Sequence, residues 1–212
     1  MNRRLLVASI ATLIASPVLA QTNAPAANAA GGATESNGAA ANGSPASQKH
    51  IKDTMQVGSL SLLMSRDALP KLTYPKLKQF ADFEIAEQET VADVLKALQS
   101  NAAPNGSVPS PAEAELMQNL DDAQRAMIAK MREMKAGLAF DREYIQQQLD
   151  GHRKLLEIQE TYLRAPDNLD QTNAAKLARG MIKEHLTLLG DLERMFGGSA
   201  RMNSGPRNRR QP

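Results

Sequence analysis

Residues 77–98 read LKQFADFEIAEQETVADVLKAL and predict one long amphipathic helix. Apolar or small side chains recur every three or four residues, which places them on one face of a helix with 3.6 residues per turn. Glu84 and Gln88 interrupt this face one turn apart, so a carboxyl and an amide group enter a stripe that is otherwise apolar. Such a helix buries its stripe against other helices. The complete stripe is Leu77, Ala81, Glu84, Gln88, Val91, Leu95 and Leu98.

Four other segments carry a similar spacing and are also expected to be helices. Ser47 and Ser110 are the expected N-caps of two of them, and Gly197 with Gly198 is expected to end the last one. Long helices with short connections predict an all-α protein, an antiparallel four-helix bundle with an additional helical segment. The expected helices span about residues 50–69, 75–100, 111–134, 141–164 and 171–196. The expected inner stripe of the last one is Ala174, Ala178, Met181, His185, Leu188, Leu192 and Met195.

The first twenty residues predict export from the cytoplasm. Two arginines are followed by a short apolar run and by small residues up to Ala20, which is the pattern of a cleaved signal peptide. The run is too short to span a bilayer, so we expect no integral membrane segment after cleavage. The expected location is the periplasm, with the outer membrane as a place of association. The expected partner is an envelope protein or a cell-wall or lipid surface.

Composition divides the remaining chain into three parts. We expect a disordered linker rich in Ala, Asn, Gly and Ser over residues 21–48, a bundle domain over 49–196 and a disordered basic tail over 197–212. Without residues 1–20 the chain has 23 basic and 23 acidic residues, and the basic excess is confined to the tail. A body without excess positive charge argues against nucleic-acid binding. The absence of cysteine excludes disulfides and cysteine-based metal sites.

Three polar residues on apolar stripes are the candidate metal ligands: Glu84, His152 and His185. Facing helices that direct carboxylate and imidazole groups inward build metal sites in bundles. A di-iron centre of the ferritin type requires Glu-x-x-His, but Leu149 and Ile182 stand three residues before the two histidines. In a second interpretation, both histidines are core residues that form hydrogen bonds with neighbouring polar side chains or water.

Methionines offer another candidate site, for a softer metal. Met127, Met131 and Met134 recur on one helix, and Met181 and Met195 are available on another. Thioether groups bind copper(I), but methionines at helical spacing more often fill an apolar core. We therefore expect these side chains to be core residues.

Three segments share a family resemblance. They are residues 77–98, AFDREYIQQQLDGHRKLLEI at 139–158 and KLARGMIKEHLTLL at 176–189. Together they resemble the bacterial family called domain of unknown function 4142, which is described as a predicted outer-membrane protein and is similar to ferritin-like four-helix bundles. The resemblance implies this fold and an envelope location. Where the family has an Asp-His pair, this chain has Glu87-Gln88, so a metal site built from the family's histidines would lack one ligand here.

The sequence predicts binding rather than catalysis. We find no Gly-x-Ser-x-Gly elbow, no cysteine nucleophile and no phosphate-binding glycine loop, and we assign no catalytic residue and no obligatory cofactor. The first expectation is an exported, non-enzymatic envelope protein that binds a partner or contributes to stress tolerance. The alternative is a periplasmic metal-binding bundle that holds copper or another divalent ion through Glu84, His152 and His185.

Export makes a direct prediction about the mature chain. We expect protein recovered from the envelope of the producing cell to begin at Gln21, because signal peptidase cleaves after a small residue such as Ala20. Intact-mass measurement and N-terminal sequencing check this. Envelope protein that still begins at Met1 would contradict the signal-peptide interpretation.

Overall fold

The computed structural model describes residues 43–100, 102–103 and 105–202, and their regular structure is entirely helical, which confirms the predicted fold class. The predicted signal segment, residues 21–42 of the predicted linker and residues 203–212 of the predicted tail lie outside this part. No helix within it is long and apolar enough to cross a membrane. The helices are α1 (Pro45–Ala68), α2 (Pro75–Ser100), α3 (Glu113–Gln118), α4 (Asp122–Glu133), α5 (Leu138–Tyr162) and α6 (Leu169–Met202).

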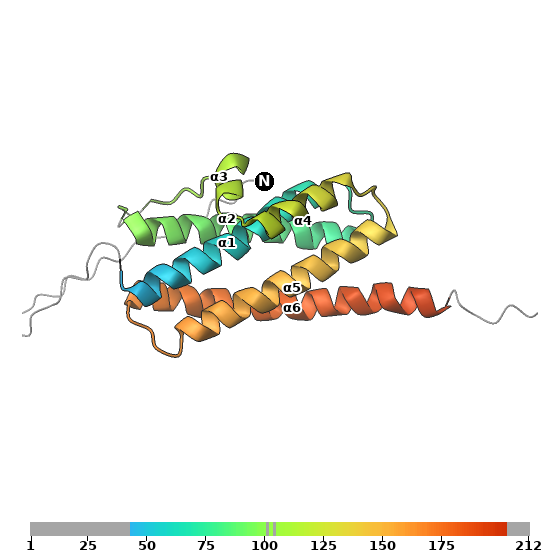
Figure 1. Cartoon of the computed structure of the whole chain (residues 1–212). Coiled ribbons are helices and arrows are strands. Elements are labelled where there is room, and N and C mark those ends of the chain that lie inside the picture. The colour runs from blue at the N-terminus through green and yellow to red at the C-terminus, as the bar shows by residue number, and fades with distance from the viewer. Residues whose placement is uncertain (1–42, 101, 104, 203–212) are drawn as a thin grey trace, which may run out of the picture. The chain divides into compact units, whose positions relative to one another are not determined.

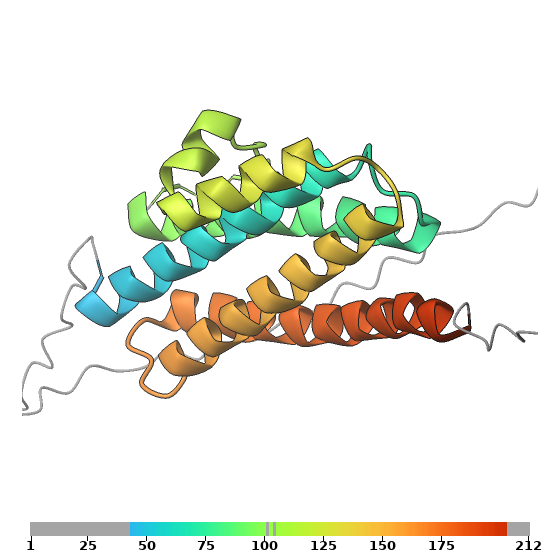
Figure 2. The same cartoon turned by 45° about the vertical axis from the view of Figure 1, so that its right-hand side comes forward.

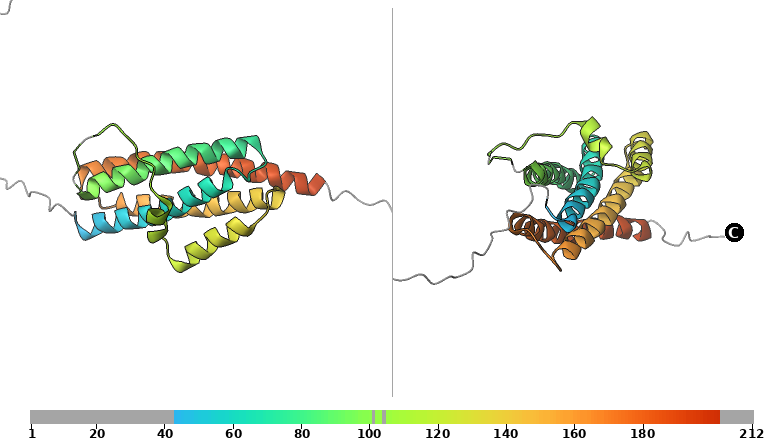
Figure 3. Two further views of the ribbon diagram at one scale, coloured as in Figure 1. Left: turned by 90° about the horizontal axis from the view of Figure 1, so that it is seen from above. Right: turned by 60° about the vertical axis from the view of Figure 1, so that its left-hand side comes forward.

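The four long helices form one bundle in which each runs antiparallel to its two neighbours (Figure 1). α1 packs on α2 and α5, and α6 packs mainly on α5 and also on α2. Residues 69–74 connect α1 to α2, and residues 163–168 connect α5 to α6. The connection from α2 to α5 is long and contains α3 and α4, which leaves α2 and α5 pointing the same way (Figure 3). α3 and α4 pack on the outer side of α1 (Figure 2).

One large apolar cluster holds this arrangement together. Its biggest buried side chains include Leu62 of α1, Phe80 of α2 and Tyr144 of α5, and α4 contributes Ile128. The stripe predicted for α2 is largely confirmed, because five of its seven members are buried, Glu84 and Gln88 among them. These two polar side chains therefore lie in the interior of the protein rather than at its surface.

The first helix begins earlier than predicted. Ser44, not Ser47, is its N-cap: the Ser44 hydroxyl accepts a hydrogen bond from the Ser47 backbone N–H at 3.1 Å. Pro45 follows at the first helical position, where its missing N–H costs nothing. The last residues assigned to the linker are thus helical, and the Ser47 hydroxyl instead donates to Asp167 at 2.6 Å.

The helix predicted over residues 111–134 is broken in two. α4 has a cap of its own, because the Asp121 side chain accepts from the Gln124 backbone while the Gln124 side chain accepts from the Asp121 backbone. α3 begins after Ala112, so the predicted Ser110 cap is wrong. The Ser110 hydroxyl donates to Glu89 at 2.7 Å, and this contact holds the connection against α2.

The last helix differs from the prediction in its end and in its inner face. α6 continues through Gly197 to Met202. A glycine commonly ends a helix by taking a positive φ just after it, and among the described glycines only Gly43 and Gly137 have a positive φ. Two predicted members of its inner stripe, Leu188 and Met195, are exposed. The face that packs against α5 and α2 is formed by Gln171, Ala175, Ile182, His185, Leu189 and Leu192.

A matched pair of leucines tests the packing. Leu77 is 0 % exposed in the core, whereas Leu177 on α6 is 77 % exposed. We expect Leu77→Ala to lower the free energy of unfolding by about 2–5 kcal/mol, because it removes buried methylenes and leaves a cavity. We expect Leu177→Ala to change it by less than about 0.5 kcal/mol. Urea unfolding of both variants measures this, and equal losses would show that the assigned core face is wrong.

Candidate metal centre

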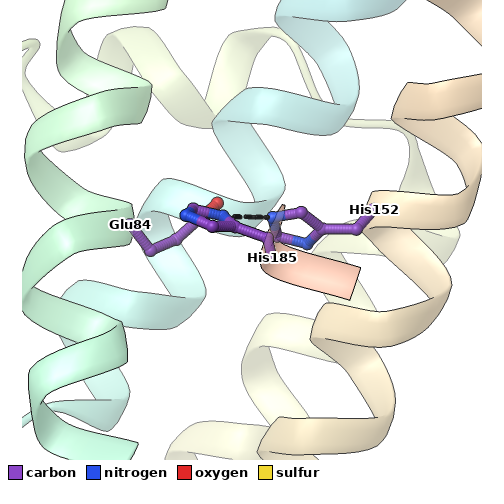
Figure 4. A group of neighbouring side chains, drawn as sticks. All are labelled: Glu84, His152 and His185. Atoms are coloured by element: carbon purple, nitrogen blue, oxygen red, sulfur yellow. Dashed lines mark hydrogen bonds and ion pairs between the residues drawn. The ribbon is translucent and has the colours of Figure 1, made fainter. Parts of the chain in front are cut away.

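Glu84, His152 and His185, which the sequence singles out, meet in the middle of the bundle (Figure 4). They come from α2, α5 and α6, and their exposed fractions are 0 %, 0 % and 5 %. Each directs one potential ligand atom to a common point, and these atoms all lie within 4.8 Å of one another. Three different helices thus present one carboxylate and two imidazoles to the same small volume.

The three facing atoms form a nearly equilateral triangle. His185 Nδ1 lies 3.0 Å from Glu84 Oε2, His152 Nε2 lies 3.2 Å from the same oxygen, and the two nitrogens are hydrogen-bonded to each other at 3.0 Å. Tetrahedral ligands at the usual Zn–N and Zn–O distances of about 2.0–2.1 Å stand roughly 3.3 Å from one another. The triangle therefore has the size that a first-row divalent ion requires, without rearrangement of the helices.

One of these atoms lacks a hydrogen bond. The other oxygen of Glu84, Oε1, accepts from the Ser61 hydroxyl at 2.5 Å. Oε2 is at ion-pair distance from both imidazoles, but neither ring nitrogen has hydrogen-bond geometry toward it, and it is a buried acceptor without a hydrogen-bond partner. Burying such an oxygen is costly unless a cation or a proton compensates it.

Contacts on the far side of each ring orient the histidines. His152 Nδ1 donates to the backbone carbonyl of Gln148 at 2.8 Å, which directs Nε2 toward Glu84. His185 Nε2 lies 2.9 Å from Glu87 Oε2, so its Nδ1 faces the centre. Metal-bound histidines commonly have a carbonyl or carboxylate in this outer position, where it selects the tautomer and raises the basicity of the ligand.

A network of hydrogen-bonded polar side chains extends from Glu84 to Tyr144. The Ser61 hydroxyl is also 2.6 Å from Gln148 Oε1, and Gln148 Nε2 donates to the Ser65 hydroxyl at 3.1 Å. Ser65 in turn is 2.8 Å from the Tyr144 hydroxyl. Burial raises the pKa of Tyr144 well above its usual value, so this group stays neutral. This hydrogen-bonded network connects α1, α2 and α5 and fixes the positions of Glu84 and His152 relative to each other.

Contacts within the site shift the pKa values of Glu84 and His152 in opposite directions. Burial alone raises the pKa of Glu84, but the two imidazoles and the Ser61 hydroxyl more than reverse this, and the net shift is downward. Burial lowers the pKa of His152, yet the Glu84 carboxylate raises it, and the net shift is upward. Burial raises the pKa of Glu87, the His185 imidazole opposes this, and neighbouring carboxylates reinforce it. A divalent ion that binds these atoms would compete with protons for the imidazole nitrogens.

The sequence predictions missed part of this environment. Ser61 and Ser65 stand one turn apart on the buried face of α1, a spacing that could have indicated them. Glu87, noted only as a departure from the family pattern, is the carboxylate behind His185. Gln88, the other departure, packs against α1, where a Cβ on Gly58 would come within 2.7 Å of its Oε1.

The third histidine belongs to a separate and fully paired cluster. His50 Nε2 is 2.7 Å from Gln159 Oε1, and its Nδ1 is 2.8 Å from Gln171 Nε2. Its ring stacks on Tyr162 with centroids 4.3 Å apart. His50 is therefore a hydrogen-bonded core histidine.

The methionines lie in two different places. Met131 is part of the apolar core, and Met127 and Met134 pack against it. Met181 instead lines a cavity between α2 and α6, and Met195 is exposed. The expected role as core residues holds for the three methionines of the predicted stripe.

His152 and His50 should give opposite pH dependences in metal-free protein. The raised pKa of His152 means that its contribution to stability is complete below pH 6.5 and is lost as the pH rises through the shifted pKa. Burial lowers the pKa of His50, although its bond to Gln159 opposes this, so its contribution is lost as the pH falls below 6.5. Urea unfolding across the neutral range, with a chelator present, measures both effects. We expect His152→Asn to remove the loss above pH 6.5 and His50→Asn the loss below it; a His152→Asn variant that keeps the wild-type slope above pH 6.5 would contradict the pairing with Glu84.

Comparison with known proteins gives a match to a protein family. The model of the family described as Domain of unknown function (DUF4142) matches residues 32–192. No curated protein and no solved structure matches the chain. The matched region contains all four long helices in whole or in large part and the three residues of the triangle. The chain belongs to the DUF4142 family.

Proposed function

We propose that this protein is a divalent-metal-binding helical bundle of the cell envelope. The observation that carries the proposal is the triangle of Glu84 Oε2, His152 Nε2 and His185 Nδ1, whose sides of 3.0–3.2 Å enclose an oxygen without a hydrogen-bond donor. A core histidine pair that serves only packing has no need for a buried carboxylate oxygen that lacks a donor.

The chemistry of the ligands limits the choice of ion. Two imidazoles and one carboxylate suit zinc, copper(II), nickel and iron(II), while the absence of sulfur ligands disfavours copper(I). Three protein ligands leave at least one coordination position for water. Residues Glu84, His152 and His185 would hold the ion, and Glu87 and the Gln148 carbonyl would orient the two rings.

The topology supports a ferritin-like bundle. A single long connection between the second and third long helices is found in that class, and here it is the segment between α2 and α5. The absence of Glu-x-x-His before His152 and His185 favours a site for one ion over a di-iron oxidase. The proposed role is therefore binding or buffering of a metal, without turnover.

The envelope location rests on the sequence of residues 1–20, which has the charge, apolar run and cleavage site of a signal peptide. Metal buffering in the periplasm is consistent with the expected contribution to stress tolerance. A metal-free protein that binds an envelope partner is the competing function, and metal analysis separates the two.

The three histidines of the chain provide a matched experiment. We expect the mature protein, stripped with a chelator and titrated with zinc or copper(II), to bind one ion per chain. His152→Ala, His185→Ala and Glu84→Gln should each abolish stoichiometric binding, because each removes a ligand. Glu87→Gln should weaken it by about 10–100-fold, as loss of an outer-shell partner does. His50→Ala removes a buried histidine outside the site and should leave metal binding unchanged.

Calorimetry and elemental analysis give the stoichiometry, and thermal unfolding gives an independent readout. Metal at 100 times its Kd should stabilise the wild type by about 2.7 kcal/mol, and the ligand variants should not respond. Absence of stoichiometric metal, or loss of binding in His50→Ala with retention in His152→Ala, would overturn the proposal.

A further inference from the structure

The connection between α2 and α3 carries the dipeptide Asn105-Gly106 in a stretch without helical structure. Residues 105–110 are all exposed. A Cβ added to Gly106 would meet no heavy atom of another described residue within 4 Å, apart from its chain neighbours. Water and hydroxide therefore reach both the Asn105 side chain and the peptide that follows it.

The Asn105 side chain is folded back along the main chain. Its Oδ1 accepts hydrogen bonds from the Ser107 backbone N–H at 2.7 Å and from the Ser107 hydroxyl at 2.6 Å. An Asn carbonyl that bonds to the N–H two residues further on forms an Asx turn, in which the side chain mimics the backbone of a β-turn. The amide carbon of Asn105, Cγ, is thereby held beside the Gly106 backbone nitrogen.

The Gly106 nitrogen is the group that can attack this carbon. Among the described residues, none accepts a hydrogen bond from its N–H, and glycine has no Cβ to hinder the approach. Attack closes a five-membered ring, and positioning of the two reacting atoms accelerates such an intramolecular step. The Ser107 N–H and hydroxyl already donate to Oδ1, the atom on which negative charge develops, as the donors of an oxyanion hole do.

We propose that Asn105 is a site of spontaneous deamidation, for which solvent hydroxide and water are the co-reactants. Hydroxide removes the Gly106 amide proton, and the nitrogen forms a bond to Cγ of Asn105. The Oδ1 oxyanion then expels Nδ2, which takes up protons from water and leaves as ammonia, and a cyclic succinimide remains. Water opens this ring at either carbonyl carbon. The product is aspartate or isoaspartate at position 105, and no group is oxidised or reduced.

Asn119 provides an internal reference in the same chain. Its Nδ2 donates to the Ser59 hydroxyl at 2.9 Å, so its side chain is anchored to α1. The next backbone nitrogen, that of Leu120, already donates to the Met117 carbonyl at 3.3 Å. Neither the amide carbon nor the attacking nitrogen is therefore free to react, and Asn119 should remain intact while Asn105 is converted.

This site is separate from the proposed metal site. The hydrogen bonds and ion pairs of Glu84, His152 and His185 within the described part of the chain involve none of residues 105–107. The new carboxylate lies on the exposed surface, so deamidated protein should bind metal like unmodified protein. Failure of one proposal is therefore distinguishable from failure of the other.

Ageing of the purified mature protein tests the proposal. At mildly alkaline pH we expect residue 105 to gain the mass of one amide-to-acid conversion. The rate should rise with hydroxide concentration, because the attacking nitrogen must lose its proton. Peptide mapping by tandem mass spectrometry assigns the position and distinguishes it from the Asn-Gly pairs at residues 37–38 and 42–43.

Unfolding in urea separates the effect of the structure from that of the dipeptide alone. We expect urea to slow deamidation at Asn105, because it disrupts the Asx turn that positions Cγ. The same treatment should speed deamidation at Asn119, because it releases both the side chain and the Leu120 nitrogen. The two asparagines therefore respond in opposite directions.

Three substitutions identify the groups responsible. Ser107→Ala removes the hydroxyl donor and should slow deamidation about three- to tenfold, less than the roughly hundredfold loss for a donor in a water-excluded oxyanion hole. Gly106→Ala places a Cβ beside the attacking nitrogen and should slow it at least about tenfold. Ser110→Ala, in the same connection, keeps residues 105–107 and should react like the wild type. Circular dichroism confirms the fold of each variant.

Three results would overturn the proposal. The first is an unmodified residue 105 under conditions in which the other two Asn-Gly pairs are converted. The second is a rate at Asn105 that urea raises or leaves unchanged. The third is a Ser107→Ala variant that deamidates as fast as the wild type.

Discussion

The Glu84 carboxylate lies at the centre of the bundle and contacts one residue from each of the other three long helices: Ser61 of α1, His152 of α5 and His185 of α6. A buried charge is strongly destabilising unless its partners are held in place, so this contact constrains the rotation and register of all four helices together. The surrounding apolar cluster supplies most of the driving force for packing but little directional information. The polar contacts around Glu84 fix how the helices are oriented relative to one another.

This constraint explains why so many polar groups are buried close together. Ser61 serves Glu84 and Gln148, and Gln148 in turn connects to Ser65 and through its backbone to His152. Replacement of the whole network by apolar side chains of similar volume would often be neutral or stabilising. A network that leaves one carboxylate oxygen without a donor is a poor device for stability alone. This unsatisfied oxygen is the basis of the proposed metal site.

The residues that carry the family resemblance have separate physical tasks around this centre. Asp141, at the start of α5, accepts hydrogen bonds from the Thr73 backbone at 3.1 Å and from its hydroxyl at 2.5 Å, which ties the α1–α2 connection to α5. Tyr144 anchors Ser65, and Phe80 packs against both site imidazoles with ring centroids 5.1 and 6.1 Å away. Glu87 contacts His185 and is also among the residues that line the α2–α6 cavity.

The amino-acid sequence alone was sufficient for the helical class, for the long helices and for the burial of Glu84, His152 and His185, because helical spacing of apolar side chains is a local property. It was insufficient where two alternative caps or two alternative helix faces differ little in free energy. Ser44 and Ser47 are both good caps, and the two faces of α6 both carry leucines, so packing against α5 and α2 selected between them. Only the tertiary structure decided that the three polar residues meet within 3.0–3.2 Å, that Glu87 lies behind His185 and that the alanines of α6 leave a cavity. The physical reason is that the relative rotation and register of helices separated by the long α2–α5 connection depend on contacts between them, which no single segment encodes.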